Sequence, residues 1–177
     1  MNRRLAVAVA LAAGLTGAQT AAVEQLVAPP LAGFVEGFAR ANAGQSIREE
    51  VPRGETVESW TRMVTTQRLT GLAARATPLE YAGNILGHVP RSCPGARVGR
   101  PASLTVSGRA AVQFQVDCPR NAGGTAETFI LLAVAGRRDM HVKQVAWRGR
   151  IGPKDLAWGR AFLAGVKLCG PEGGCRR

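Results

Sequence analysis

Runs of apolar residues with the pattern of β-strands dominate the second half of the chain. Four such runs, separated by turn residues, cover residues 103–106, 111–117, 127–135 and 140–148. In the second run Val112, Phe114 and Val116 recur at every other position, which predicts a strand with one buried face. The third run is apolar on both faces and is therefore predicted to be a central strand. The short connections between the runs predict antiparallel pairing.

Helical spacing replaces this alternation in two segments. Thr77-Pro78-Leu79-Glu80 has the residues of a capping box, with threonine at the N-cap and glutamate three residues later. Apolar residues then recur at helical spacing, and Gly87 and Pro90 are expected to end the helix. A second helix is predicted to open at Gly152-Pro153. Its apolar arc indicates core contacts rather than a cofactor site and consists of Leu156, Trp158, Phe162, Leu163 and Val166.

A β-hairpin is predicted over residues 47–66, with a tight turn at Pro52-Arg53-Gly54-Glu55. The returning strand, Trp60–Leu69, has no cleanly apolar face, so one side of it is expected to be partly exposed. Residues 23–30 are expected to form a loose lead-in and residues 31–40 an irregular strand. The sequence therefore predicts an α+β fold, in which an antiparallel sheet of about six or seven strands is covered by two helices and stapled by disulfides.

The N-terminal residues resemble a secretory signal. Arg3 and Arg4 precede an apolar stretch, Leu5–Leu15, and small residues follow, with cleavage expected after Ala18 or Ala22. A transmembrane anchor would need about 20 apolar residues, more than this stretch supplies. We therefore expect a signal peptide over 1–22, a single domain over 23–170 and a Gly-rich basic tail over 171–177. The mature protein is expected to be periplasmic or secreted, without a transmembrane anchor.

The four cysteines all follow the expected signal. In an oxidising compartment they are expected to form disulfides, for which three pairings are possible. We favour Cys93–Cys118 and Cys169–Cys175. No Cys-x-x-Cys spacing occurs, so neither zinc nor another metal is expected.

Arginine dominates the charge of the chain. The net charge is +11, and removal of Arg3 and Arg4 with the signal would leave +9. No acidic residue occurs between Tyr81 and Val116, and a second basic block follows residue 136. An anion-attracting patch and a bias from GC-rich coding both explain these arginines, and both interpretations stay open. The candidate binding residues are Arg62, Arg91, Arg97, Arg100, Arg109, Arg137, Arg138 and Arg148.

Candidate catalytic residues are few. His88 is expected to lie in the last turn of the first helix, where it would interact with the helix dipole, and His141 is expected to be solvated at the start of a strand. The chain has no Walker, dinucleotide-binding, nucleophile-elbow or zinc-protease motif, so no catalytic residue or cofactor is assigned. Nucleic acid is not expected as a partner, because aromatic residues are not interleaved with the arginines.

One motif resembles a known group of proteins. The residues are Glu-x-Val-Pro-x-Gly-Glu-Thr-x-x-x-Trp-Thr over 49–61, Cys118-Pro119, Glu127, and Val-Lys-Gln-x-x-Trp over 142–147. They resemble uncharacterised exported proteins of Gram-negative bacteria, and the order of elements is similar to that of PsbP-like α/β/α sandwiches. The resemblance implies a fold and an exported location, and it implies no activity.

Three functions are consistent with these observations. We favour a periplasmic accessory or binding protein, without enzymatic activity, that engages anionic envelope polymers or an envelope protein through the arginine-rich loops and the exposed side of the Trp60–Arg68 strand. A small-ligand-binding or hydrolytic protein would instead use a cleft between helix and sheet, lined by His88 or His141 and a carboxylate. A structural subunit of an envelope complex would show an exposed apolar patch.

Overall fold

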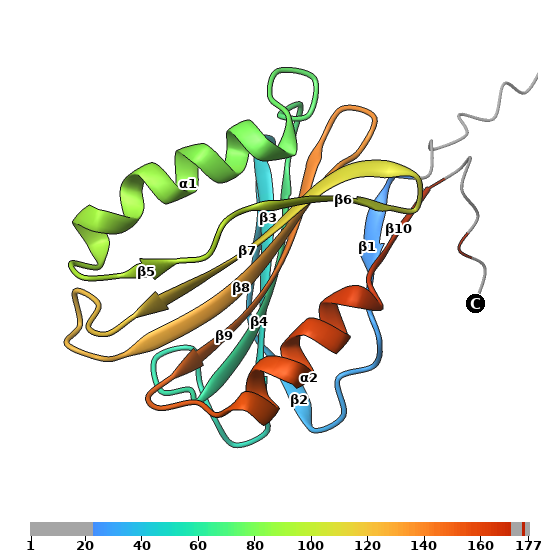
Figure 1. Cartoon of the computed structure of the whole chain (residues 1–177). Coiled ribbons are helices and arrows are strands. Elements are labelled where there is room, and N and C mark those ends of the chain that lie inside the picture. Colours follow the sequence, from blue (N-terminus) through green and yellow to red (C-terminus); the bar gives the residue numbers. More distant parts are fainter. Residues whose placement is uncertain (1–22, 171–174, 176–177) are drawn as a thin grey trace, which may run out of the picture.

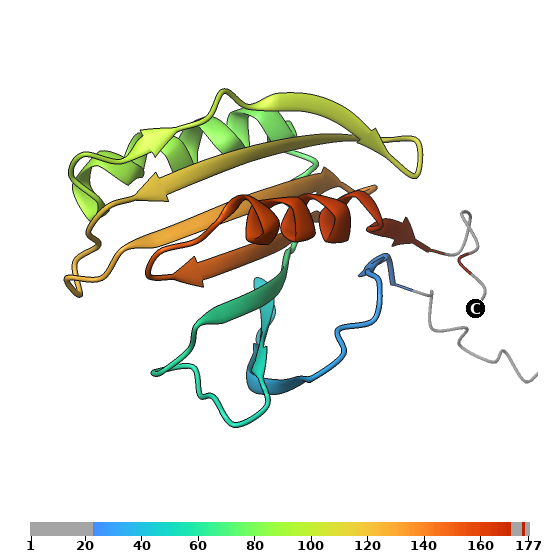
Figure 2. The same cartoon turned by 60° about the horizontal axis from the view of Figure 1, so that its bottom comes forward.

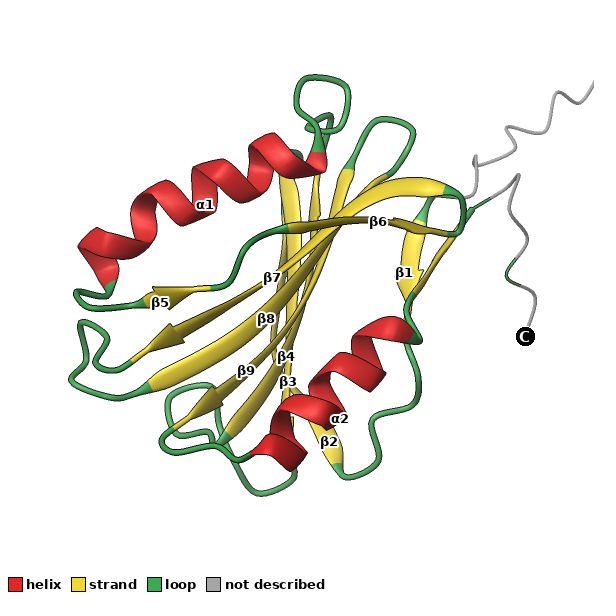
Figure 3. Cartoon of the chain, in the orientation of Figure 1, coloured by secondary structure: helices red, strands yellow, loops and turns green. Residues whose placement is uncertain are grey.

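The structure, a computed structural model, describes residues 23–170 and Cys175. The signal peptide expected over 1–22 lies outside the described residues, as does the tail over 171–177 except for Cys175. Within the described residues, two helices and ten strands follow one another (Figures 1 and 3). They are β1 (Gln25–Val27), β2 (Phe34–Ala41), β3 (Gln45–Pro52), β4 (Arg62–Leu69), α1 (Pro78–Ser92), β5 (Arg97–Val98), β6 (Ala102–Val106), β7 (Arg109–Cys118), β8 (Glu127–Ala135), β9 (Met140–Arg148), α2 (Pro153–Ala164) and β10 (Lys167–Cys169).

The main sheet has eight strands, all paired antiparallel, in the order β2-β3-β4-β9-β8-β7-β5, with β6 also paired to β7. Figure 2 shows α2 in front of this sheet and α1 behind it. The predicted α+β class with two covering helices is therefore confirmed. The sheet was predicted to have about six or seven strands and has eight, one of which, β5, has only two residues; β1 and β10, with three residues each, form a separate ribbon. Strands this short leave no periodic pattern in the sequence.

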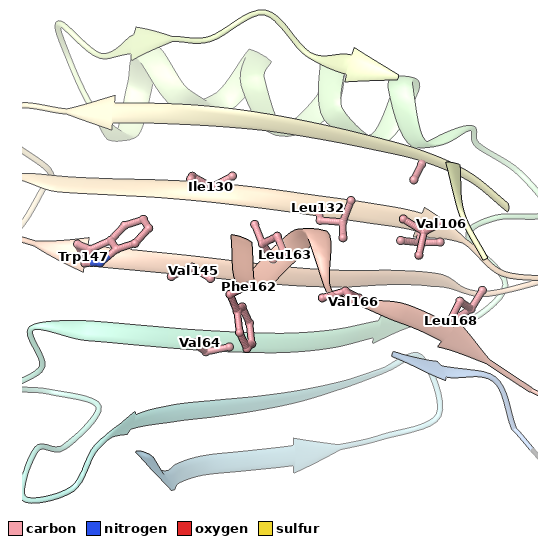
Figure 4. Close-up of a cluster of buried hydrophobic side chains, with 12 residues drawn as sticks. Val64, Val106, Ile130, Leu132, Val145, Trp147, Phe162, Leu163, Val166 and Leu168 are labelled. Carbon is pink, nitrogen blue, oxygen red and sulfur yellow. The ribbon is translucent and has the colours of Figure 1, made fainter. Parts of the chain in front are cut away.

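Strand β8 lies at the centre and has a core on each face. Ile130, Leu132 and Val134 pack with Phe162 and other residues of α2, which Figure 4 shows over the sheet. The intervening residues of β8 lie on the opposite face, where they pack with Ala82 of α1. Because successive strand residues point to opposite faces, the apolar run over 127–135 supplies both cores at once.

Helix α1 begins with the predicted capping box. The Glu80 N–H donates to Thr77 Oγ1 at 3.2 Å, and the Thr77 N–H donates to Glu80 Oε2 at 2.7 Å. The predicted end at Gly87 or Pro90 was wrong, because the helix continues to Ser92. Its last turn is held on the sheet: Val89 is buried, and the Cys93–Cys118 disulfide joins the C-cap to the end of β7. This packing stabilises a turn that contains proline.

The predicted turn at Pro52-Arg53-Gly54-Glu55 is present, because the Glu55 N–H donates to the Pro52 carbonyl at 2.9 Å and Gly54 has a φ of +90°, but it does not join the two strands directly. Glu50 pairs with Val64, so nine residues, 53–61, connect β3 to β4. Glu55 closes this loop, since its carboxylate accepts the Thr61 N–H and hydroxyl, each at 2.7 Å. Trp60 lies in the loop rather than in the strand, and it is buried against Val51 and Met63.

Two further expectations in the first half of the chain need correction. The lead-in contains β1, which pairs with β10, whereas the irregular strand is present as β2 with a bulge between Glu36 and Phe38. The strand now bounded as β4 was expected to expose one side. It lies between β3 and β9, and none of its residues is exposed. Met63–Thr65 are buried and the other residues of β4 are half-buried, so the binding surface predicted on this strand is reduced to its half-buried residues.

Both favoured disulfides, Cys93–Cys118 and Cys169–Cys175, are present in the structure. Disulfides of this kind form and persist in oxidising compartments outside the cytoplasm. No helix within the described residues is long and apolar enough to cross a membrane.

Candidate functional site

A hollow with many arginines lies where β5 and β7 face α2, and we call it the arginine groove. Its two adjoining parts have volumes of about 480 and 570 Å³ and share Arg97, Gln115 and Asp117 in their walls. Strand β5 brings Arg97 to the groove, and the connection to β6 brings Arg100. The arginines of the groove are Arg97, Arg100, Arg150 and Arg160.

The groove is strongly cationic, because Asp117 is the only carboxylate among the residues that line it. A chain of hydrogen bonds holds this carboxylate: Arg160 Nη2 donates to Gln115 Oε1 at 3.1 Å, and Gln115 Nε2 donates to Asp117 Oδ1 at 2.9 Å. Arg97, Arg100 and Arg150 are exposed, and their guanidinium groups form no ion pair or hydrogen bond with the residues that the structure describes. Their donors face solvent and are free to meet an anion.

Three of the predicted binding arginines have partners inside the fold. Arg62 Nη2 lies 3.0 Å from Asp155 Oδ1, and its guanidinium stacks 4.4 Å from the Trp158 ring. Arg109 donates to the carbonyls of Ala135 and Gly136. The third, Arg148, lies 4.2 Å from the Trp60 ring and donates to the Glu58 carbonyl at 2.7 Å. These contacts tie loops and α2 to the sheet.

The other predicted arginines are scattered. Arg91 lies in the last turn of α1, while Arg137 and Arg138 lie in the turn between β8 and β9. That turn is at the opposite end of β8 from Glu127, which pairs with Cys118, the neighbour of the Asp117 that pairs with Arg97. Of the eight predicted arginines, the structure brings only Arg97 and Arg100 together in the groove. Arg150 belonged to the second basic block but was not chosen as a site residue, and it lies in the connection between β9 and α2. Arg160 was not chosen either, because only the packing of α2 on the sheet brings it to the groove.

A second polar region lies on the α2-facing side of β3, β4 and β9. Lys143 on β9 is only 3% exposed, and its Nζ donates to Thr66 Oγ1 at 2.6 Å. The same nitrogen lies 3.7 Å from Glu50 Oε2 and faces the Phe162 ring at 5.8 Å. Burial lowers the pKa of Lys143, while the Glu50 carboxylate acts in the opposite direction.

The expectation that His141 is solvated was wrong, because its exposure is only 2%. Burial lowers the pKa of His141, Glu24 and Asp139 raise it, and Arg68 lowers it. His88 is exposed near the C-terminal end of α1, in the position predicted for it. No group of three or more His, Cys, Asp or Glu residues that could hold a metal ion occurs in the described part of the chain.

Comparison with known proteins shows the fold and no sequence family. No family model matches the chain, and no curated protein matches it. Among solved structures, a point mutant of the protein Mog1 matches with a TM-score of 0.50 and 7% identity, over 85% of this chain and 97% of that one. A Pseudomonas aeruginosa protein of unknown function, PA94, described as a putative regulator, matches with a TM-score of 0.44 and 14% identity, over 81% and 82% of the two chains.

LpqN, described as involved in cell envelope biogenesis of Mycobacterium tuberculosis, matches with a TM-score of 0.47 and 11% identity, over 87% of each chain. At these identities the likeness concerns the fold alone, and the two lower TM-scores support no argument. The chain therefore has a fold similar to the Mog1 and PsbP-like proteins, in agreement with the topology predicted from the sequence.

Proposed function

We propose that this protein is an exported binding protein that holds an anionic component of the Gram-negative envelope in the arginine groove. The observation that carries the proposal is the charge of the groove, where four arginines face a single carboxylate. Three of these guanidiniums have no partner in the described part of the chain. Guanidinium groups bind phosphate and carboxylate oxygens with paired hydrogen bonds, which favours ligands that carry those groups.

The location rests on separate observations. The two disulfides indicate an oxidising environment, and the sequence over 1–22 has the pattern of a secretory signal. The resemblance to exported Gram-negative proteins favours the periplasm. In that compartment the abundant anionic polymers carry phosphate and sugar groups, and the hydroxyl groups of the sugars could hydrogen-bond with Gln115 and Thr128 in the groove walls.

The test uses the oxidised mature protein and a fluorescent, phosphorylated core oligosaccharide of lipopolysaccharide. We expect binding that weakens as salt rises, because ions screen exposed charges. The variant R97E/R100E should bind at least about tenfold more weakly, since one charge-assisted hydrogen bond contributes about 1.5 kcal/mol. The matched control R40E/R53E makes the same charge change at two exposed arginines outside the groove.

Equal weakening in the two variants would show that net charge alone drives binding, and it would refute the groove. Unchanged binding in R97E/R100E would do the same. The small-ligand alternative is supported by one observation, a pocket lined by both His141 and Glu24. That pocket lies elsewhere in the molecule and leads to a separate inference.

A further inference from the structure

A pocket of about 340 Å³ opens on the polar side of β3, β4 and β9, and we call it the sheet-face pocket. Its roof is the N-terminal segment 23–26, and its floor is formed by Ser46, Arg48, Thr66, Arg68 and His141. The volume is that of a site for a small molecule rather than a polymer. The pocket shares no lining residue with the arginine groove.

Strand register arranges the floor as two rows. In the first row Ser46 pairs with Arg68, which pairs with His141. In the second row Arg48 pairs with Thr66, which pairs with Lys143. Residues directly opposite each other in antiparallel strands share a face, so all six side chains project to the same side. Each of them can donate a hydrogen bond, and none is a carboxylate.

Several of these donors have no hydrogen-bond acceptor. His141 is 98% buried, and its Nε2 has no hydrogen-bond partner. Arg48 and Arg68 approach carboxylates only at 3.5 and 3.9 Å, which is longer than a hydrogen bond. Thr66 Oγ1 accepts from Lys143, so its own hydroxyl hydrogen remains for another acceptor. A buried polar atom without a partner requires an explanation, and a bound ligand is one.

Two of the three nearby acids accept hydrogen bonds from backbone N–H groups. Glu24 Oε2 accepts the Arg137 N–H at 2.7 Å, and Asp139 Oδ1 accepts the Gly71 N–H at 2.8 Å. Glu50 Oε2 lies 3.7 Å from Lys143 Nζ and 3.5 Å from Arg48 Nη2, and it has no hydrogen-bond partner. Glu24 and Asp139 therefore hold the edges of the pocket, Glu50 balances the charge of Lys143, and the floor still has donors for a group that brings its own oxygens.

We infer that the sheet-face pocket is a second binding site, which takes a small molecule through its carboxylate or phosphate group. Arg48 and Arg68 are diagonal neighbours on adjacent strands and flank the oxyanion. The hydroxyls of Ser46 and Thr66 donate to it between the two guanidiniums, and His141 contributes its unpartnered nitrogen from β9. The N-terminal segment 23–26 closes over the ligand.

The two histidines provide the test, because His88 is exposed on α1 and serves as an internal control for His141. The ring protons of both are followed by NMR during separate titrations with inorganic phosphate, succinate and chloride. We expect phosphate or succinate to move the His141 signals in a saturable way while the His88 signals stay unchanged. The probe that acts identifies whether the site takes phosphate or carboxylate groups.

Two variants extend the test. R68Q and T66V should each weaken the saturable response at least about tenfold, because each removes a donor to the oxyanion. T66V preserves the shape of the side chain and keeps the test informative if R68Q unfolds. R97E/R100E should leave the response intact, which separates this site from the groove. A His141 signal that moves with neither probe, or that moves equally with chloride, would overturn the inference.

Discussion

Gly159 in α2 gives the sharpest prediction about how the groove is built. The helix crosses the sheet so closely that a Cβ added at Gly159 would meet the Trp147 ring, with Cζ2 at 2.9 Å and Cη2 closer still. Trp147 is 2% exposed and cannot swing out into solvent. The variant G159A must therefore move α2 away from the sheet or force the indole out of its preferred rotamer. Arg160, the next residue, would move with the helix.

The magnitude follows from the size of the overlap. Overpacking a tight core contact by one methyl group destabilises a protein by about 1–3 kcal/mol. Alanine in place of glycine also favours the helix by up to about 1 kcal/mol, which offsets part of this loss. We expect G159A to lower the free energy of unfolding by about 2 kcal/mol, which lowers the melting temperature by about 4–8 °C in a domain of this size.

Urea and thermal unfolding followed by circular dichroism measure the change. The matched control is G83A in α1, where an added Cβ meets nothing within 4 Å. That variant should raise the free energy of unfolding by about 0.5–1 kcal/mol. In a W147F background, which removes the second ring, the loss caused by G159A should shrink. A G159A protein as stable as the wild type would refute the close packing of α2 on Trp147.

Three further predictions concern stability. T77A removes the N-cap of α1 and should lower the free energy of unfolding by about 1 kcal/mol in urea; an unchanged midpoint would contradict the capping role. C93A/C118A should lower the free energy of unfolding by about 3 kcal/mol and C169A/C175A by about 2 kcal/mol, because the first disulfide closes a longer loop. A larger drop in melting temperature for C169A/C175A than for C93A/C118A would contradict this. Burial lowers the pKa of His141 in the folded protein below its ordinary 6.5, so the unfolded chain binds more protons, and the free energy of unfolding should fall as the pH drops below about 6.5. Urea unfolding from about pH 7 to about pH 5 measures this decline, which should be smaller in H141Q. Equal slopes in the two proteins would contradict the burial of His141.

Much of the fold could be predicted because its signals are local. The bounds of β8 and β9 match the predicted runs. For β8 the reason is that a strand buried on both faces is a nearly continuous apolar segment between turns. The capping box at Thr77 likewise involves residues three apart. The loop after β3 was missed because its closure depends on Glu55 and Thr61, six residues apart, and on the burial of Trp60.

The sites were harder to predict, because long-range packing assembles them. The acid-free stretch identified Arg97 and Arg100, but Arg160 reaches the groove only through the docking of α2 on the sheet. The polarity of His141 suggested solvent exposure, whereas its strand lies inside the sheet and the N-terminal segment covers this part of its face. Neither effect has a signature within a short window of sequence.

The most direct test of the arginine groove is to record which arginines respond to an anion. Side-chain Nε–Hε signals of the labelled, oxidised mature protein would be assigned and followed while the phosphorylated core oligosaccharide is added. The account predicts that Arg97, Arg100, Arg150 and Arg160 shift together and saturate, while Arg40 and Arg53 stay unchanged. Shifts spread evenly over all exposed arginines, or confined to residues outside the groove, would contradict it.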